Sequence, residues 1–381
     1  METTKNDLPI MEVGNENIVL FHPHIPKNAA NYIADTLSTR WIGQGPKVDK
    51  FENDFSKRFL NGQTSLAVGA GTDALHLAYI LADLKVGDEV VVPVFTCTAT
   101  NIPFLYMGVK IVFADVQKNT LNIDVEHVKE LVNEKTKAIV CVHYGGLPCD
   151  MDEIHQIAKQ WDIPVIEDAA HALGGSYKGT PIGAISEFTM FSFQAIKHIT
   201  TGDGGMLSLK DKKLRDLAER VRWFGIDRCA KQQGHWENDI REVGYKYQMT
   251  DIAASMGLAA LEEFDEIFSL RRKLFGIYED KLTNIDGIHF IGGNYKDRVH
   301  AAWLCTILAE KRVDLQRKLR EFKIESNQVH YRNDRYTIFG GRRNNLPNMD
   351  ALEDKYLVLP LHTKLNEENI YRVCEVIKSG W

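Results

Sequence analysis

Lys197 has the clearest chemical potential in this sequence, because it lies between an apolar run and a glycine-rich turn. The segment around it reads FSFQAIKHITTGDGG, residues 191–205. A lysine removed from water at such a junction has a lowered pKa, and its neutral amine can attack an aldehyde. Taken alone, a lysine near a turn is more often a solvated surface charge. The hypothesis of a reactive amine therefore depends on the residues that accompany it.

Asp168 and His171 form a second candidate group, in the segment PVIEDAAHA at residues 164–172. An apolar run ends at Asp168, and doubly wound α/β folds bind ligands at the carboxyl ends of their strands. A carboxylate there can keep the ring nitrogen of pyridoxal phosphate (PLP) protonated, while His171 can hydrogen-bond the phenolic oxygen of the ring. The alternative is that Asp168 only caps a following helix.

Gly71 and Thr72 lie in VGAGTDAL, residues 68–75, between a predicted strand and a predicted helix. Backbone N–H groups at the start of a helix bind phosphate, and the Thr72 hydroxyl can add a hydrogen bond. The segment is neither a Walker loop nor a dinucleotide-binding fingerprint, and an ordinary turn explains it equally well. Its significance comes from its occurrence together with Lys197 and Asp168.

The elements that must position these residues alternate in type from Thr64 onward. Short apolar β-rich runs followed by helical patterns predict parallel strands joined by right-handed crossovers, in a sheet covered on both faces. The predicted strands are SLAVG, EVVVP, KIVFAD, AIVCVH and PVIED, with helices over 71–84, 97–107, 124–133 and 151–160. Adjacent strands at 188–193 and 204–209 and a helix over 211–223 follow. The fold class is therefore α/β.

A domain boundary is expected near residue 260, within a long helical pattern over about 250–282. Residues 1–260 would form the large domain, with the first 20 or so loosely held, and residues 261–381 a smaller α+β domain. In the small domain we expect strands near 287–290, 301–309 and 325–331 and helices near 312–322 and 366–378.

The composition argues against several classes of partner. The net charge is −6 without a long basic run, so nucleic acid is not expected to bind. No run of about 18 apolar residues and no apolar leader occurs, which predicts a cytoplasmic protein without membrane contact. Six scattered cysteines without a CxxC pair predict reduced thiols rather than a disulfide framework or a metal site. They are Cys97, Cys141, Cys149, Cys229, Cys305 and Cys374.

The motifs GTDAL, VIEDAAHA and FSFQAIKHITTGDGG, with VHYGG at 142–146 between the first two, together resemble the DegT/StrS (DegT/DnrJ/EryC/StrS) family of nucleotide-sugar aminotransferases. The resemblance is strongest between about Gly43 and about Gly257. It implies a fold-type I aminotransferase with PLP as cofactor and a mostly parallel seven-stranded sheet in the large domain. The implied reaction moves an amino group from L-glutamate to a nucleotide-linked keto sugar, with carbon 4 favoured over carbon 3, in a homodimer with shared active sites.

The resemblance also implies roles around the cofactor. Lys197 would bind PLP covalently, and Lys246, in GYKYQMTDI at 244–252, would reach the phosphate bound by the partner subunit, unless it is a surface lysine at a helix start. Cys97 stands where the family commonly has an aromatic residue that stacks on the ring, so the stacking must come from elsewhere or the ring is held less tightly. The implied cofactor residues are Gly71, Thr72, Cys97, Asp168, His171, Ser192, Lys197 and Lys246.

Two segments match substrate-contacting loops of the family, GQGP at 43–46 and VHY at 329–331. The residues RNDRY that follow at 332–336 depart from the family pattern. Their arginines can contact a diphosphate through two parallel hydrogen bonds or stay as solvated charges at the rim. The candidate substrate residues are Gly43, Gln44, His330, Tyr331, Arg332 and Arg335.

Two alternative functions remain open at this point. Related PLP-fold sugar dehydratases carry histidine where this chain has Lys197, so the alignment disfavours a dehydratase. A non-catalytic sugar-nucleotide sensor would be expected to lose the lysine or the acid, whereas this chain keeps both Lys197 and Asp168.

Overall fold

Seven strands form the central sheet of the computed structural model, which describes residues 8–237 and 239–381. Their order across the sheet is β1-β10-β9-β6-β5-β2-β4, and β10 runs antiparallel to both neighbours while the other pairs are parallel. The mostly parallel seven-stranded sheet and the adjacency of β9 and β10 are thereby confirmed. The strands are β1 (Thr64–Val68), β2 (Glu89–Pro93), β4 (Lys110–Ala114), β5 (Thr136–Val142), β6 (Val165–Asp168), β9 (Phe188–Ser192) and β10 (Gly205–Leu209).

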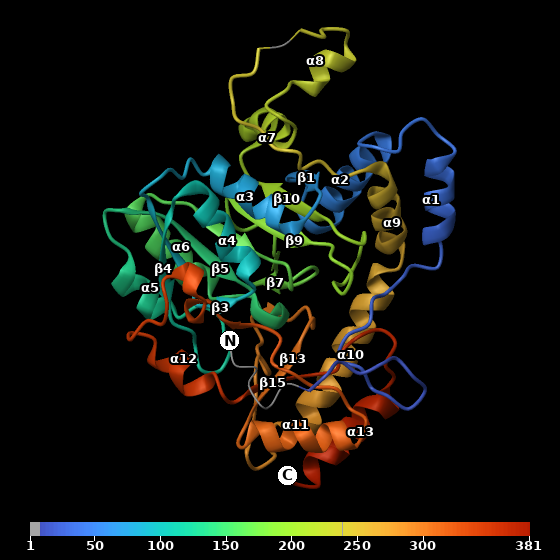
Figure 1. Cartoon of the computed structure of the whole chain (residues 1–381), viewed down its shortest axis with the longest axis vertical. Coiled ribbons are helices and arrows are strands. Elements are labelled where there is room, and N and C mark those ends of the chain that lie inside the picture. Colours follow the sequence, from blue (N-terminus) through green and yellow to red (C-terminus); the bar gives the residue numbers. More distant parts are fainter. Residues whose placement is uncertain (1–7, 238) are drawn as a thin grey trace.

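Helices cover both faces of this sheet (Figure 1). Side chains of β2 alternate between the two cores: Val90 and Val92 pack into one, and Val91 packs into the other. That period of two is what a strand buried on both faces requires. One face carries α3 (Gly71–Leu81), α4 (Thr98–Met107) and α7 (Arg215–Arg222); the other carries α2 (Pro46–Phe59), α5 (Val125–Leu131), α6 (Met151–Trp161) and α9 (Asp251–Glu262).

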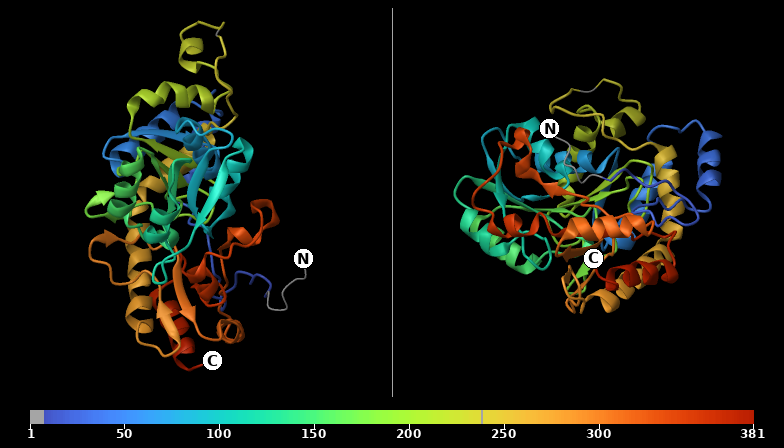
Figure 2. Two further views of the ribbon diagram at one scale, coloured as in Figure 1. Left: turned by 90° about the vertical axis from the view of Figure 1, so that its left-hand side faces the viewer. Right: turned by 60° about the horizontal axis from the view of Figure 1, so that its bottom comes forward.

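The predicted long helix over 250–282 is two helices, α9 and α10 (Phe264–Leu282), which meet at Glu263. The sequence reading also missed α1 (Ala29–Leu37) and α2. The short helix α8 (Arg228–Gln232) lies on an arm that projects from the large domain, as both Figure 1 and Figure 2 show.

Residues 261–381, which we propose form the predicted small domain, contain a three-stranded antiparallel sheet, β11-β13-β15. The expected strand near 325–331 does not form; this segment contributes one bridge, Asn327 to Val358, and the two-residue strand β14. β14 pairs with β3 of the large domain, so the segment joins the domains instead of extending the small sheet. The elements are β11 (Ile288–Phe290), β13 (Cys305–Ala309), β15 (Tyr356–Leu359), β14 (Tyr331–Arg332), β3 (Phe95–Thr96), α11 (Arg312–Glu321), α12 (Pro347–Leu352) and α13 (Glu367–Lys378); β12 (Arg298–Val299) pairs with β7 (Ser176–Tyr177), which pairs with β8 (Thr180–Pro181).

The N-terminal segment was expected to be loose over its first 20 or so residues. Residues 1–7 lie outside the described part of the chain. From Met11 onward the segment is held by Glu325, whose carboxylate accepts the backbone N–H groups of Met11 (3.1 Å) and Leu20 (2.8 Å), and Ile18 is buried. The expectation is therefore wrong for residues 11–20. Among the described helices, none is long and apolar enough to cross a membrane.

Candidate active site

Lys197 and Asp168 line one cavity of about 340 Å³ at the carboxyl ends of the central strands. Asp168 is the last residue of β6, and Lys197 follows the end of β9, the next strand in the sheet. The volume lies within the range of small-molecule sites. The predicted residues that line this cavity are Gly71, Thr72, Cys97, Asp168, His171, Ser192, Lys197 and His330.

The Lys197 amine is held among apolar groups. It lies over the ring of Trp303, 3.6 Å from the ring centroid, and within the described residues it makes no hydrogen bond or ion pair. Burial lowers the pKa of Lys197 to about 8, and the nearby charge of Asp168 only partly opposes this shift. A lysine with this pKa is largely neutral at mildly alkaline pH, which is the form that attacks an aldehyde.

The Asp168 carboxylate is buried and hydrogen-bonded on both oxygens. The Thr100 hydroxyl donates to one oxygen at 2.7 Å, and the N–H of Ala170 donates to the other at 3.1 Å. Burial raises the pKa of Asp168, whereas these two hydrogen bonds and the charge of Lys197 lower it. No helix follows within residues 169–175, so the alternative role as a helix cap is not realised. A buried carboxylate of this kind is suited to hold a protonated ring nitrogen.

The N-terminus of α3 opens on the cavity. No side chain caps it, because the N-cap residue is Ala70. A Cβ on Gly71 would lie 3.2 Å from both Met190 and Ser192, so glycine lets the helix start close to β9. A Cβ on Gly205 would lie 2.6 Å from the C=O of Ala70, which explains glycine there too. The uncapped helix start, with hydroxyl groups beside it, fits a phosphate.

His171 lies in a column of stacked rings. Its ring is 3.8 Å from that of Trp303 with 17° between their planes, and 5.2 Å from that of His330. The N–H of Gly145 donates to His171 Nδ1 at 3.3 Å, which leaves Nε2 to carry the proton. Burial lowers the pKa of His171, so a neutral ring is expected. The uncapped start of α3 and the His171 N–H supply hydrogen-bond donors. Together with the Lys197 amine and the Asp168 carboxylate, they are the groups that PLP requires.

Sequence reasoning missed two residues of this site. Thr100 occurs in an ordinary-looking stretch of α4, and Trp303 comes from the small domain, far along the chain from Lys197. Thr100 lies three residues after Cys97, but nothing in the sequence marks it as a partner of Asp168, and Trp303 lies in none of the motifs. Cys97 lines the cavity with an exposed thiol, and its effect on ring stacking stays a prediction.

Six predicted residues lie outside this cavity within the same chain: Gly43, Gln44, Lys246, Tyr331, Arg332 and Arg335. Lys246 bridges to Trp223, and its amine lies 5.5 Å from the Phe224 ring at the base of the arm. The C=O of Gly43 accepts the N–H of Asp251, and Gln44 lines a different cavity. Tyr331 pairs with Thr96 in β14 and β3, beside the cavity rather than in its lining.

Arg332 requires a correction. Its guanidinium is buried and forms ion pairs with Asp334 (2.6 Å), Asp350 and Glu353 (3.5 Å). It is therefore neither a diphosphate ligand nor a solvated charge at the rim, since three carboxylates already engage it. Arg335 is exposed and stacks over the ring of Tyr331 at 4.6 Å.

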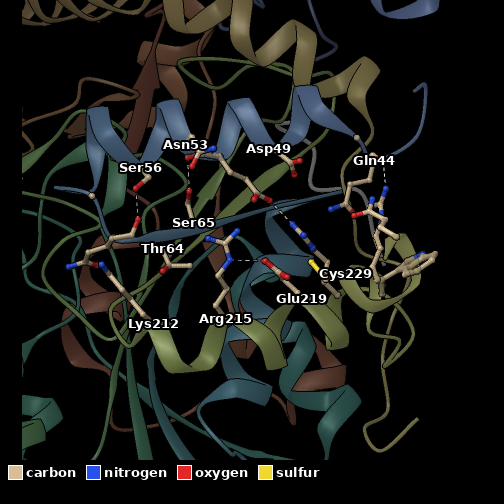
Figure 3. Close-up of a pocket in the computed structure, with 18 residues that line it drawn as sticks. Gln44, Asp49, Asn53, Ser56, Thr64, Ser65, Lys212, Arg215, Glu219 and Cys229 are labelled. Atoms are coloured by element: carbon tan, nitrogen blue, oxygen red, sulfur yellow. Dashed lines mark hydrogen bonds and ion pairs between the residues drawn. The ribbon is translucent and has the colours of Figure 1, made fainter. Parts of the chain in front are cut away.

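The cavity that Gln44 lines has a volume of about 570 Å³ and lies between α2 and α7 (Figure 3). Asp49, Asn53 and Ser56 of α2 face Arg215 and Glu219 of α7 across it. Arg215 pairs with Glu219 at 2.7 Å, so these opposite charges satisfy each other.

A buried ion pair closes the inner wall of this second cavity. Arg222 pairs with Glu52 at 2.6 Å. Glu52 accepts the N–H of Ala67, and Arg222 donates to the C=O of Ala67, both within 2.9 Å. Because β1 is an edge strand, the pair replaces a neighbouring strand and blocks unwanted pairing.

Cys141, His143 and Cys149 are brought together in the core, although the sequence predicted no metal site. His143 donates from Nε2 to Glu167 at 2.8 Å, and its Nδ1 accepts the N–H of Cys149 at 3.0 Å. Both ring nitrogens are thus engaged, and we assign the cluster a packing role behind Asp168. All six cysteines are free thiols.

Comparison with known proteins gives the family. The family model of the DegT/DnrJ/EryC1/StrS aminotransferases matches residues 23–378. The chain is 34% identical to GDP-perosamine synthase of Escherichia coli O157:H7, over 94% of this chain and 97% of the relative. It is 32% identical to UDP-4-amino-4-deoxy-L-arabinose–oxoglutarate aminotransferase of Shewanella sediminis, over 96% and 98%.

The same likeness holds for solved structures. The PLP form of Spr1654 from Streptococcus pneumoniae, assigned as a sugar aminotransferase, superposes with a TM-score of 0.89 at 29% identity, covering 95% of this chain and 98% of that one. The family resemblance, the fold type and the use of PLP, all predicted from the motifs, are confirmed.

Proposed function

This chain belongs to the DegT/DnrJ/EryC1/StrS aminotransferase family and is a PLP-dependent sugar aminotransferase, and we propose that it aminates a nucleotide-linked keto-deoxy sugar with L-glutamate as donor. Carbon 4 of the sugar is favoured over carbon 3. The product would serve the synthesis of a polysaccharide or glycoconjugate. The observation that carries the proposal is the common cavity of the Lys197 amine and the Asp168 carboxylate.

Each group of the cavity has a place in binding the cofactor. When bound, PLP supplies an aldehyde that joins amines and a ring that withdraws electrons from the substrate carbon. Thr72, Ser192 and the start of α3 would hold its phosphate. Asp168 would pair with the ring nitrogen, and His171, neutral with its proton on Nε2, would donate to the phenolic oxygen.

Lys197 would move the proton in both halves of the reaction. Its neutral amine would take a proton from the α-carbon of glutamate and pass it to the cofactor. In the second half it would carry a proton back from the cofactor to the sugar carbon. A pKa of about 8 makes both forms accessible near neutral pH, as general acid–base catalysis requires. Delivery from one side of the cavity would fix the configuration of the new amine.

The names of two relatives support the substrate class. One contains GDP and the other contains UDP and oxoglutarate, the keto acid that glutamate leaves behind. They support a nucleotide-linked sugar and a glutamate donor without choosing the nucleotide.

We further propose a homodimer in which each subunit completes the other's site. Lys246, Gly43 and Gln44 lie outside their own chain's Lys197 cavity, so a role in binding phosphate or substrate requires a second copy. The arm beside Lys246 also exposes Trp236 and Val243, with 76% and 79% of their surfaces accessible, as a contact surface would.

Mixing two inactive variants tests the shared sites. Hybrid dimers of Lys197→Ala and Lys246→Glu would hold one cavity with both substitutions and one intact cavity. Random exchange should restore roughly a quarter of wild-type activity. A mixture as inactive as its parents, with subunit exchange verified by mass, would contradict sharing.

The reaction itself is tested with pure enzyme, PLP, 15N-labelled glutamate and a panel of GDP-, UDP- and dTDP-linked 3-keto and 4-keto sugars. Mass spectrometry should find 15N in one sugar product and an equal amount of 2-oxoglutarate. A product that has lost water without gaining nitrogen would identify a dehydratase. Binding of a sugar nucleotide without turnover of any panel member would favour a sensor.

A further inference from the structure

Trp303 connects the small domain to the lysine of the cavity. Its indole is 2% exposed, and the Lys197 amine lies over its face at 3.6 Å from the ring centroid. The indole N–H donates to the C=O of Ile196 at 3.0 Å. One side chain therefore contacts both the amine of Lys197 and the backbone of the residue before it.

The backbone at Trp303 is fixed independently of the lysine. Arg271 of α10 donates to the C=O groups of Ala302 (3.0 Å) and Trp303 (2.9 Å), and the N–H of Trp303 donates to Gly145. Ala302 has a φ of 54°, a left-handed conformation that a residue other than glycine keeps only where its surroundings enforce it. The fold therefore determines where the indole lies.

The ring itself is also held by its neighbours. His171 stacks on it at 3.8 Å, and Phe21 stacks on it at 5.9 Å with 20° between the planes. Trp303 cannot turn away from Lys197 without breaking these stacks and the hydrogen bond to Ile196. The amine thus meets a fixed π surface.

We propose that Trp303 is a positioning residue, which holds the free Lys197 amine over its indole face and stabilises the protonated form of that amine. The inference rests on the proposed role of Lys197 in moving the proton. An ammonium group over an indole is attracted by the negative face of the ring, most strongly where water is excluded.

The arrangement suits a group that must both take and return a proton. Burial and the positive charge of Arg271 favour the neutral amine, whereas Cys97, Asp168 and the indole favour the ammonium. Unlike a further carboxylate, the indole offers no oxygen that would compete for the proton. It can balance the two forms without becoming a proton acceptor itself.

The test measures the pKa of Lys197 in the cofactor-free protein, from the pH dependence of its acetylation by acetic anhydride, quantified by mass spectrometry of the Lys197 peptide. Trp303→Leu removes the π face and Trp303→Phe keeps a weaker one. Phe275→Leu, in the small-domain core around α10, is the matched control for loosened packing.

We expect Trp303→Leu to lower the pKa of Lys197 by about one unit, a tenfold change in the neutral fraction, and Trp303→Phe by less. Phe275→Leu should leave it unchanged. In the enzyme loaded with the pyridoxamine form of the cofactor, the amine must start neutral to take up the proton that it delivers to the sugar carbon. The acid limb of the reaction with keto sugar should therefore move to lower pH by the same amount.

An unchanged pKa in Trp303→Leu, or an equal shift in Phe275→Leu, would overturn the proposal. If Trp303→Leu does not fold, an unchanged pKa in Trp303→Phe decides against it. The measurement uses neither PLP nor sugar, so its failure is distinct from a failure of the proposed amination.

Discussion

The cavity around Lys197 and the cavity between α2 and α7 use polar groups in opposite ways. In the second cavity, which measures about 570 Å³, Arg215 pairs with Glu219 and Arg222 with Glu52. In the first, about 340 Å³, the Lys197 amine forms no ion pair within the described residues.

The contrast teaches that volume and charge do not by themselves mark a reactive site. Charges that satisfy each other stabilise a fold, whereas an amine left among apolar groups keeps a displaced pKa and the capacity to react. Lys197, with a pKa lowered to about 8, belongs to the second kind.

The largest expected effect is that of Lys197→Ala on turnover. Removal of the amine should reduce amination by about 10⁴-fold or more, because both proton transfers lose their carrier. Stopped-flow or long-incubation product assays measure the loss, and circular dichroism checks the fold. Turnover at the wild-type rate would exclude Lys197 as the catalytic base.

Arg222→Leu should lower the stability of the fold and leave turnover unchanged. It leaves Glu52 buried without its partner, which should lower the free energy of unfolding by about 3–5 kcal/mol, while turnover of the folded enzyme stays unchanged. Urea unfolding measures the loss. Arg215→Ala, at an exposed pair, is the matched control and should cost less than about 1 kcal/mol.

The Arg222→Leu penalty should also depend on pH. Burial raises the pKa of Glu52, and loss of Arg222 raises it further, so the folded variant takes up a proton more readily than the unfolded chain. The variant should therefore lose more stability as the pH rises from about 5 to 8. Equal losses at both pH values would contradict a buried charged carboxylate.

Asp168→Asn should lower turnover by about a hundredfold while the bound cofactor, measured by absorbance after denaturation, changes little. An amide is neutral, so it cannot stabilise a protonated ring nitrogen. Wild-type turnover in this variant would remove the role assigned to Asp168.

Thr100→Val should have the smallest effect, roughly tenfold on turnover at acidic pH, the scale of one hydrogen bond to a charged group. The Thr100 hydroxyl lowers the pKa of Asp168, so its removal raises that pKa. Activity should then fall at a higher pH than in the wild type as acid is added. A pH profile that coincides with wild type would show that Thr100 does not act on Asp168.

The features that the sequence predicted correctly are those that depend on short segments of the chain. The strands of the central sheet and the adjacency of β9 and β10 followed from apolar runs, and Lys197, Asp168 and Gly71 followed from motifs at strand ends. Short local motifs are enough to predict these residues as one site, because the carboxyl ends of parallel strands lie at the same edge of the sheet.

What the sequence could not predict depends on contacts between distant segments. Trp303 reaches Lys197 because Arg271 fixes a left-handed turn at Ala302. No sequence pattern predicts that turn. Arg332 was misread because its ion-pair partners Asp350 and Glu353 lie on and beside α12, which the sequence did not reveal.

The role of Lys197 in binding PLP is tested most directly by reducing the PLP-loaded enzyme with borohydride and mapping the attached phosphopyridoxyl group by mass spectrometry. We expect a single labelled peptide, modified at Lys197, and loss of the label when glutamate is added before reduction. Labelling of another lysine in the folded enzyme, with Lys197 unmodified, would contradict it.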